Sequence, residues 1–231
     1  MSSVLGVIPA RGGSKGVPRK NLALIGGRPL ISWSIETGKE LVSSGALSRC
    51  VVSTDDAEIA EVARGLGADV PFIRPPEIAG DSSKASEYLR HALDFLDPTG
   101  RIYSYALILQ PTSPQRDAMR IGHAISQFCQ SGFESMISCY EDAYVNPAVM
   151  YELLDDTVTL RGLTDLHGAE LRRQDHRPVL IRTGVLYLVS VDYFRSTGRI
   201  ISGSPALYRV SRREAVNVDT PEDLELLKAL L

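Results

Sequence analysis

Short runs of almost continuous apolar residues alternate with longer amphipathic segments through most of this chain of 231 residues. The first apolar run, Val4 to Pro9, precedes a loop, and apolar residues then recur at helical spacing from Leu30 to Leu41. A strand that is apolar on both faces is typical of a parallel sheet with helices on each side. Strands that alternate with helices are typical of βαβ units. We therefore predict an α/β architecture with a largely parallel sheet.

Further elements continue the alternation. The predicted strands are 50–53, 69–73, 105–109, 135–139, 183–189 and 206–210. The predicted helices are one that ends at Gly67 and those at 87–96, 117–131, 191–197 and 221–230. Thr220 is the expected N-cap of the last helix, and Pro221 suits its first turn.

Residues 140–182 interrupt the alternation. The segment is polar, contains only short strand-like pieces and has no sustained apolar period. We interpret it as an excursion from the sheet that forms a lid or a dimerisation arm. The prediction is one domain over residues 1–231, with an arm inserted at 140–182.

Charge and cysteine content restrict the class of protein. The formal net charge is -3 and the pI is about 5.8, so no global field would attract nucleic acid or an anionic membrane. Cys50, Cys129 and Cys139 are odd in number and lack CxxC spacing, which suits a reducing compartment. The N-terminus lacks signal-peptide features, and no apolar run approaches the ~20 residues that span a bilayer. We expect a cytoplasmic protein without nucleic-acid or membrane partners.

The loop after the first strand, IPARGGSKGVPRKN at 8–21, combines glycines with cations. In parallel α/β sheets, ligands bind beyond the carboxyl ends of the strands. Gly12, Gly13 and Gly16 are expected to adopt positive φ and to bring backbone N–H groups close to an anion. The pattern predicts a phosphate clamp, with a merely flexible basic loop as the alternative. The loop matches neither GxxxxGK[ST] nor GxGxxG.

This loop closely resembles the signature of the cytidylyltransferases that activate nine-carbon acidic sugars: the CMP-sialic acid synthetases (acylneuraminate cytidylyltransferases) and their legionaminate and pseudaminate relatives. Further motifs agree in order and spacing: STDD at 53–56, RPPEIAGD at 74–81, LQPTSPQR at 109–116, RRQD at 172–175, TGVLY at 183–187 and NVDTPEDL at 217–224. The resemblance spans almost the whole chain. It implies a Rossmann-like fold of the nucleotide-diphospho-sugar transferase type, and a homodimer whose arm reaches toward the partner's site.

The reaction that the resemblance implies is attack of the sugar's anomeric hydroxyl on the α-phosphorus of CTP, which gives CMP-sugar and pyrophosphate. Such in-line chemistry requires mainly positioning and charge neutralisation. By resemblance, Arg11, Lys15 and Lys20 are the catalytic cations. The other residues implied to bind the nucleotide are Gly12, Gly13, Ser14, Asn21, Arg74 and Asp81. Residues 79–83 are candidates for reading the cytosine, and a direct contact from Arg19 stays open.

The same resemblance implies a sugar pocket. Its residues are Gln110, Thr112, Arg116, Arg173, Gln174 and Tyr187. Gln110 would contact the sugar near its anomeric centre, and Arg116 would bind the sugar or order its own loop. Arg173 matches the family's arginine for the sugar carboxylate, a suitable partner for a guanidinium. Nearby alternatives to it are Arg172, Arg177 and Arg182.

A divalent ion, Mg²⁺ or Mn²⁺, is expected because it neutralises charge on phosphate oxygens. Where the family often reads DIDT, this chain reads NVDT at 217–220. We therefore predict Asp219 as the main metal ligand and Asn217 as a weaker ligand or an outer group. Asp55 and Asp56 form another acidic pair, but their position ahead of a helix favours capping.

Two other functions stay open. A nucleotidyltransferase of the same fold could act on a different sugar or sugar phosphate, and a neutral acceptor would not need Arg173. A nucleotide-binding protein without turnover is the second alternative, because Asn217 replaces a carboxylate. The identity of the sugar also stays open, since Thr183 stands where many relatives have Asn. Pyrophosphate release from CTP with a panel of acid sugars distinguishes these functions.

Overall fold

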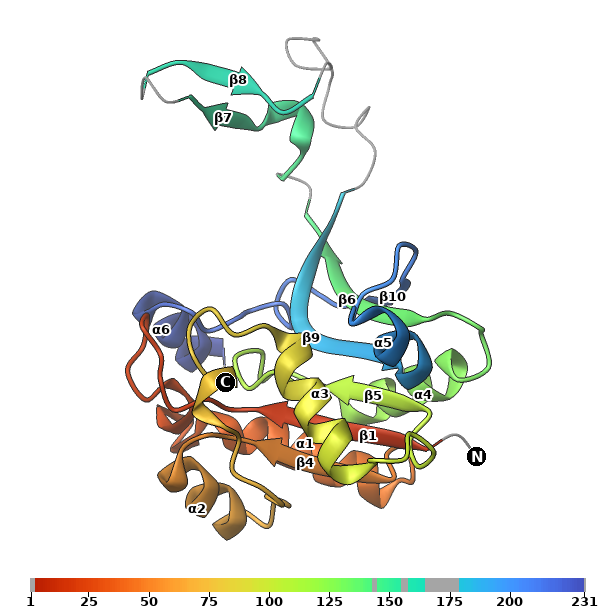
Figure 1. Cartoon of the computed structure of the whole chain (residues 1–231). Helices are drawn as coiled ribbons and strands as arrows, with labels where there is room; N and C mark the ends of the chain where they lie inside the picture. Colours follow the sequence, from red (N-terminus) through yellow and green to blue (C-terminus); the bar gives the residue numbers. More distant parts are fainter. Residues whose placement is uncertain (1–2, 143–144, 155–157, 165–178, 231) are drawn as a thin grey trace.

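The computed structural model describes residues 3–142, 145–154, 158–164 and 179–230. Its centre is a six-stranded sheet in the order β10-β6-β9-β5-β1-β4 (Figure 1). The strands are β1 (Val4–Pro9), β4 (Arg49–Ser53), β5 (Tyr105–Ile108), β6 (Ser135–Glu141), β9 (Leu180–Ser190) and β10 (Ala206–Arg209). β9 is antiparallel to both of its neighbours, while the other pairs are parallel. The predicted α/β architecture is confirmed.

Helices surround this sheet, and short sequence signals set their ends. They are α1 (Leu30–Ser43), α2 (Ala57–Gly65), α3 (Ala85–Leu96), α4 (Ala118–Phe128), α5 (Val191–Thr197) and α6 (Pro221–Leu230). The Asp56 carboxylate accepts a hydrogen bond from the Ile59 N–H at 2.9 Å and so caps α2. Gly67, at φ 80°, follows that helix where a stop was predicted. The Thr220 hydroxyl accepts from the Asp223 N–H at 3.2 Å, as expected for its cap position.

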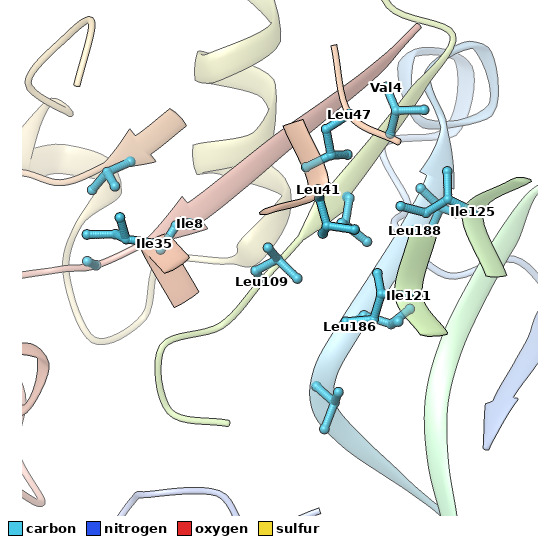
Figure 2. Close-up of a cluster of buried hydrophobic side chains, with 14 of the residues drawn as sticks. Val4, Ile8, Ile35, Leu41, Leu47, Leu109, Ile121, Ile125, Leu186 and Leu188 are labelled. Atoms are coloured by element: carbon cyan, nitrogen blue, oxygen red, sulfur yellow. The ribbon is translucent and has the colours of Figure 1, made fainter. Parts of the chain in front are cut away.

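Two apolar clusters attach the helices to the two faces of the sheet. One cluster includes residues of α1, α2 and α4, and the other includes residues of α3 and α5. Residues of β1 divide between them, with Val4 and Ile8 in the first cluster and Leu5 and Val7 in the second. Figure 2 shows side chains of the first cluster. β1 is therefore buried on both faces, as its apolar sequence predicted.

One predicted strand is absent, and another is longer than expected. Residues 69–73 form no strand, because only Asp69 bridges to the sheet, at Val51. Pro71 has no N–H to donate, which prevents a longer ladder there. The predicted strand 183–189 is confirmed within the longer β9, which runs antiparallel to its neighbours. It brings the chain back from the end of β6 into the same sheet, and such a return needs no crossover helix.

β6 and β9 lead out of the body of the molecule into a segment that we call the arm, residues 142–179 (Figure 1). Its described part contains a 3-10 helix (Pro147–Val149) and a hairpin of β7 (Tyr151–Leu153) and β8 (Leu160–Gly162). Exposed apolar side chains gather on the arm: Val149, Met150, Tyr151, Leu153, Val158, Leu160 and Leu163. The excursion predicted at 140–182 thus begins within β6 and ends within β9.

The loop after β1 continues into a 3-10 helix (Lys20–Leu22) and a small hairpin of β2 (Leu24–Ile25) and β3 (Arg28–Pro29). Ile25 packs with Leu30, Val218 and Leu227 in a third small cluster, which attaches this region to α6. Within the described residues, no helix combines the length and apolar character that crossing a bilayer requires.

Candidate functional site

A cleft of about 440 Å³ lies at the carboxyl edge of the sheet, where the chain leaves β1 and β5. Its walls come from the loops after these strands, from residues 74–88 and from residues 217–219. Most of the predicted site residues line it: Arg11, Gly13, Ser14, Lys20, Asn21, Arg74, Asp81, Gln110, Thr112, Asn217 and Asp219. The parallel pairing of β1 with β5 explains how segments so far apart in the sequence meet here.

Two glycines of the loop after β1, Gly12 and Gly16, allow close packing rather than unusual backbone angles. None of Gly12, Gly13 and Gly16 has a positive φ, so that expectation was wrong, and Arg19 has the left-handed conformation instead (φ 54°). A Cβ at Gly16 would lie 2.1 Å from the Asp219 carbonyl oxygen. The Gly12 N–H donates to Asp55 at 3.0 Å and therefore does not point freely into the cleft.

Two of the predicted catalytic cations share one carboxylate. Asp81 accepts from the Arg11 guanidinium at 2.7 Å and lies 2.9 Å from the Lys15 ammonium. These two cations, Lys15 foremost, lower the pKa of the Asp81 carboxyl. The Asn21 amide, meanwhile, donates to the Arg11 carbonyl oxygen at 2.9 Å and braces the loop. Arg11 and Lys15 are therefore already paired with a carboxylate of the chain itself.

The third predicted catalytic cation, Lys20, reaches the far end of the chain. Its ammonium donates to the Val218 carbonyl oxygen at 2.8 Å and to the Asp219 carboxylate at 2.9 Å. The Asn217 amide also donates to Asp219. Asp223 accepts from the Asp219 N–H at 2.9 Å, which ties this turn to the start of α6. Helix capping thus places the carboxylate that the sequence nominated for a metal.

Arg74 is a buried cation, 3% exposed, that lines the cleft and shares the Asp55 carboxylate with Gly12 of the loop after β1. Burial lowers the pKa of its guanidinium. The Asp55 carboxylate, whose Oδ1 lies 3.4 Å from Arg74 Nη2, partly offsets this lowering. Arg74 Nε has no hydrogen-bond partner within the described part of the chain. An unsatisfied buried donor is costly, so a bound acceptor beside Arg74 would be stabilised.

Tyr88 of α3 also lines the cleft, and sequence reasoning missed it. Burial raises the pKa of its hydroxyl, so Tyr88 keeps its proton at neutral pH. Its place in the first turn of an amphipathic helix gave only the signal of a core residue. What adds it to the site is the position of α3 directly after residues 76–84, which form the same wall.

Gln110 and Thr112 follow β5 and line the cleft, whereas Arg116 does not. The Arg116 guanidinium donates to the carbonyl oxygens of Gln110 (2.6 Å) and Val185 (2.7 Å) and to the Ser34 hydroxyl (2.9 Å). Burial lowers its pKa to about 9, which leaves it protonated at neutral pH. These contacts favour the second of its two predicted roles, that of ordering its own loop.

Other predicted residues lie away from the cleft or outside the described residues. Gly12 and Tyr187 do not line it, and the Lys15 side chain is 83% exposed at its rim. Arg19 binds Asp56 and Glu58 instead of facing the cleft. Arg173 and Gln174, with their alternatives Arg172 and Arg177, fall outside the described residues.

The donor set suits a metal only in part. Within the described ranges, no three His, Cys, Asp or Glu side chains gather as metal ligands would. Asp219 is the carboxylate that lines the cleft beside Lys20, and Asn217 Oδ1 accepts from the Ser113 hydroxyl at 3.2 Å. One carboxylate fits Mg²⁺ bound mainly by substrate phosphates, because that ion keeps few protein ligands. Asp55 and Asp56 are instead used by Gly12, Arg74 and the start of α2.

Comparison with known proteins places this chain in a family. A sequence model described as cytidylyltransferase matches residues 5–177. The pseudaminic acid cytidylyltransferase of Campylobacter jejuni is 30% identical, over 97% of this chain and 94% of that protein. The CMP-N,N'-diacetyllegionaminic acid synthase of Legionella pneumophila is also 30% identical, over 99% of this chain and 96% of that protein. The N-acylneuraminate cytidylyltransferase of Escherichia coli is 26% identical, over 97% of this chain and 51% of that protein.

A solved structure shares the fold. The CMP:2-keto-3-deoxy-manno-octonic acid synthetase complexed with CTP superimposes with a TM-score of 0.71 at 18% identity, over 99% of this chain and 98% of that one. This similarity covers the β1 to α6 framework as a whole, including the strands that form the cleft.

Proposed function

The chain belongs to the cytidylyltransferase family, and we propose that it transfers the CMP group of CTP to a nine-carbon acidic sugar in the cytoplasm. The acceptor is a pseudaminic, legionaminic or sialic acid, the sugars named for its relatives. The observation that carries the proposal is that Arg11, Lys20 and the buried Arg74 line one cleft at the carboxyl edge of β1 and β5. A polyanion is the ligand that such a cleft stabilises best.

The reaction is an in-line displacement. The anomeric oxygen of the sugar forms a bond to the α-phosphorus, the bond from that phosphorus to the bridging oxygen breaks, and pyrophosphate leaves. The proton of the sugar hydroxyl passes to solvent. Lys20 and Arg11 stabilise the charge that develops on the α-phosphoryl oxygens and on pyrophosphate, as preorganised cations do. Lys15 joins them from the rim.

Nucleotide binding uses the walls beside these cations. Gly13 and Ser14 present backbone and hydroxyl groups to the phosphates, while Asn21 keeps the loop in place through the Arg11 carbonyl oxygen. Residues 79–83 read the cytosine with backbone groups and short side chains. Arg74 supplies its unsatisfied Nε to an acceptor on the nucleotide.

The acceptor sugar lies against the loop after β5. Gln110 and Thr112 contact it near the anomeric carbon. Tyr187 of β9 packs against the apolar cluster that includes Tyr88 of the cleft wall. Arg173 binds the sugar carboxylate and Gln174 helps to position the sugar, both from outside the described residues. A guanidinium fork explains why an acidic sugar would be preferred over a neutral one.

Asp219 would hold a divalent ion, Mg²⁺ or Mn²⁺, with Asn217 as a weaker or outer partner. The ion would neutralise phosphate charge. In the described structure both Asp219 oxygens accept from groups of the chain itself, Lys20 and Asn217. Lys20 therefore keeps this carboxylate oriented toward the cleft when no ion is bound.

Pyrophosphate release tests the proposal. The full chain is incubated with CTP, MgCl₂ and each of sialic, legionaminic and pseudaminic acid, with the neutral sugar N-acetylmannosamine in parallel. We expect release with at least one acid sugar and none with the neutral one. Release only with a neutral sugar or a sugar phosphate supports a related nucleotidyltransferase instead. Nucleotide binding without any release supports a non-catalytic protein.

We also propose a homodimer formed through the arm. Exposed apolar side chains on β7 and β8, among them Leu153 (57%) and Leu160 (56%), would be buried by a second copy. Sedimentation equilibrium should give twice the chain mass. Leu153→Asp together with Leu160→Asp should give monomers, and a dimer that persists in this variant would contradict the proposal.

A further inference from the structure

Strand β9 leaves regular pairing with β6 beside Ser138. The Ser138 hydroxyl accepts hydrogen bonds from the Leu186 N–H at 3.0 Å and from the Thr183 hydroxyl at 2.7 Å. It thus provides an acceptor where the regular ladder between the strands is interrupted. Gly184 lies between these two contacts. Irregular pairing of this kind redirects a strand and is common next to binding sites.

Arg116, which follows β5, holds the same part of β9 around Gly184 from the side opposite β6. Its guanidinium donates to the carbonyl oxygen of Val185 at 2.7 Å and lies 3.5 Å from that of Gly184. The same group holds the Gln110 carbonyl oxygen at 2.6 Å. The Gly184 backbone is therefore held between Ser138 and Arg116, and moving it would break several partly buried hydrogen bonds.

Gly184 faces two side chains at very short range. A Cβ at this position would lie 2.3 Å from Gln110 Oε1 and 2.8 Å from Ser113 Oγ. Its φ is not in the left-handed region, so the backbone conformation itself would accept alanine. The end of the Gln110 side chain is the most flexible atom group in this contact. A side chain at position 184 would thus displace Gln110 rather than unfold the strand.

Of the two side chains that face Gly184, one lines the cleft and the other is hydrogen-bonded to a residue that lines it. Gln110 lines it directly, and Ser113 donates to Asn217, whose amide donates to Asp219. We infer that Gly184 is a positioning residue: the absence of its side chain lets Gln110 reach the acceptor sugar and lets Ser113 orient Asn217 beside Asp219. This inference rests on the proposed function and deepens it, because it assigns a residue that controls the sugar side of the cleft.

The experiment compares Gly184→Ala with Gln110→Ala, the double variant and the matched control Gly203→Ala. A Cβ at Gly203 meets no atom within 4 Å, and its φ is also outside the left-handed region. Two quantities are measured: the NMR shifts of the Gln110 side-chain amide, and kcat and KM for the sugar and for CTP.

We expect Gly184→Ala to shift the Gln110 amide resonances, to lower kcat/KM for the sugar about tenfold or more, and to change KM for CTP little. In the Gln110→Ala background the same change should cost less than about threefold, because the closer of its two contacts, that with Gln110, is already gone. Gly203→Ala should match the unmodified chain.

Three results would overturn the inference. Unmoved Gln110 resonances in Gly184→Ala would do so whether or not the chain turns over a sugar. Moved resonances with unchanged sugar kinetics would show that the contact does not serve the reaction. A full additional loss in the Gln110→Ala background would show that Gly184 does not act through Gln110. Absence of turnover in the unmodified chain with every sugar refutes the proposed function, and the amide shifts then report separately on the contact.

Discussion

The two edges of the central sheet hold their charged side chains in opposite ways. At the amino edge, Asp97 follows α3 and is fully buried, and its carboxylate accepts from the backbone N–H groups of Arg101 (2.9 Å), Ile102 (3.0 Å) and Tyr103 (3.1 Å). At the carboxyl edge, Lys20 pairs with Asp219 across 199 positions of sequence. The charge of Asp97 is hydrogen-bonded by backbone groups of its own turn. The charged side chains of the cleft are instead paired with side chains from distant parts of the sequence.

This difference indicates that the charged groups at one edge stabilise the fold and those at the other edge are available to bind a ligand. The fold holds the backbone N–H groups around Asp97 in place, so their hydrogen bonds to the carboxylate persist in the folded state and contribute to the free energy of unfolding. The side-chain pairs of the cleft are partly exposed, and exposed ion pairs contribute little to stability. Such pairs can exchange a partner within the chain for a phosphate at small cost. The carboxyl edge is thus suited to a ligand, and the amino edge to the scaffold.

Lys20→Ala should give the largest functional loss. Removing a preorganised cation from developing phosphoryl charge should lower kcat by about 10²-fold or more. The melting temperature should change by only a few degrees, since the Asp219 side chain is 66% exposed. Pyrophosphate release and thermal unfolding are the measurements. Lys228→Ala, which removes a surface pair with Glu225, is the control. Retained turnover in Lys20→Ala would remove Lys20 from the reaction.

Asp97→Ala should give the largest loss of stability. Three backbone N–H groups would lose their acceptor, which should cost about 1–3 kcal/mol. Urea unfolding measures this loss, and kcat of the folded fraction should not change. Asp94→Ala is the matched control, because Asp94 pairs with Arg195 at the surface, where an ion pair contributes little to stability. Equal stability of the two variants would contradict the contrast between the edges.

Asp97 should also shape acid unfolding. Burial opposes its ionisation, but the N–H groups of Tyr103, Arg101 and Ile102 outweigh burial and lower its pKa. A lowered pKa in the folded state gives stability that is fully present above the unfolded value of about 3.9 and is lost as pH falls below it. Asp97→Asn should therefore show a smaller loss of stability between about pH 5 and pH 2. Identical pH profiles would refute this assignment.

Asn217→Asp should strengthen metal binding several-fold, since it would place a second carboxylate beside Asp219. Isothermal titration with Mn²⁺ in the presence of CTP measures the affinity, and the Mg²⁺ dependence of turnover gives a second readout. An unchanged affinity would exclude Asn217 from the ligands.

Arg19→Gln should have the smallest effect. Its guanidinium binds Asp56 and Glu58 and does not line the cleft, although it neighbours Lys20 in sequence. We expect Kd for CTP to change less than about twofold. A tenfold weakening would place Arg19 in the clamp.

The helices, most strands and the cationic loop were predictable because their signals are local. Apolar spacing and caps such as Asp56 and Thr220 act within a few residues, and the structure follows them closely. One failed prediction has a local cause as well, because Pro71 limits the expected strand 69–73 to one bridge. The antiparallel direction of β9 was not predicted, since it depends on the return of the chain from the arm.

Site chemistry was predictable only as a set of residue types. The sequence nominated Lys15, Lys20 and Asp219 without their partners, and it credited Gly12 and Gly16 with positive φ that they do not have. It missed Tyr88, because a tyrosine on an amphipathic helix carries no signal that it faces a cleft.

By itself the sequence determined which segments form helices and strands and which charges gather after β1. Only the tertiary structure decided which carboxylate meets which cation, why Gly16 and Gly184 must lack a side chain, and that Arg116 orders its loop. The physical reason is the distance along the sequence over which each kind of interaction acts. Periodicity and capping operate over a few residues, whereas these contacts depend on the order and direction of strands that the apolar pattern leaves undetermined.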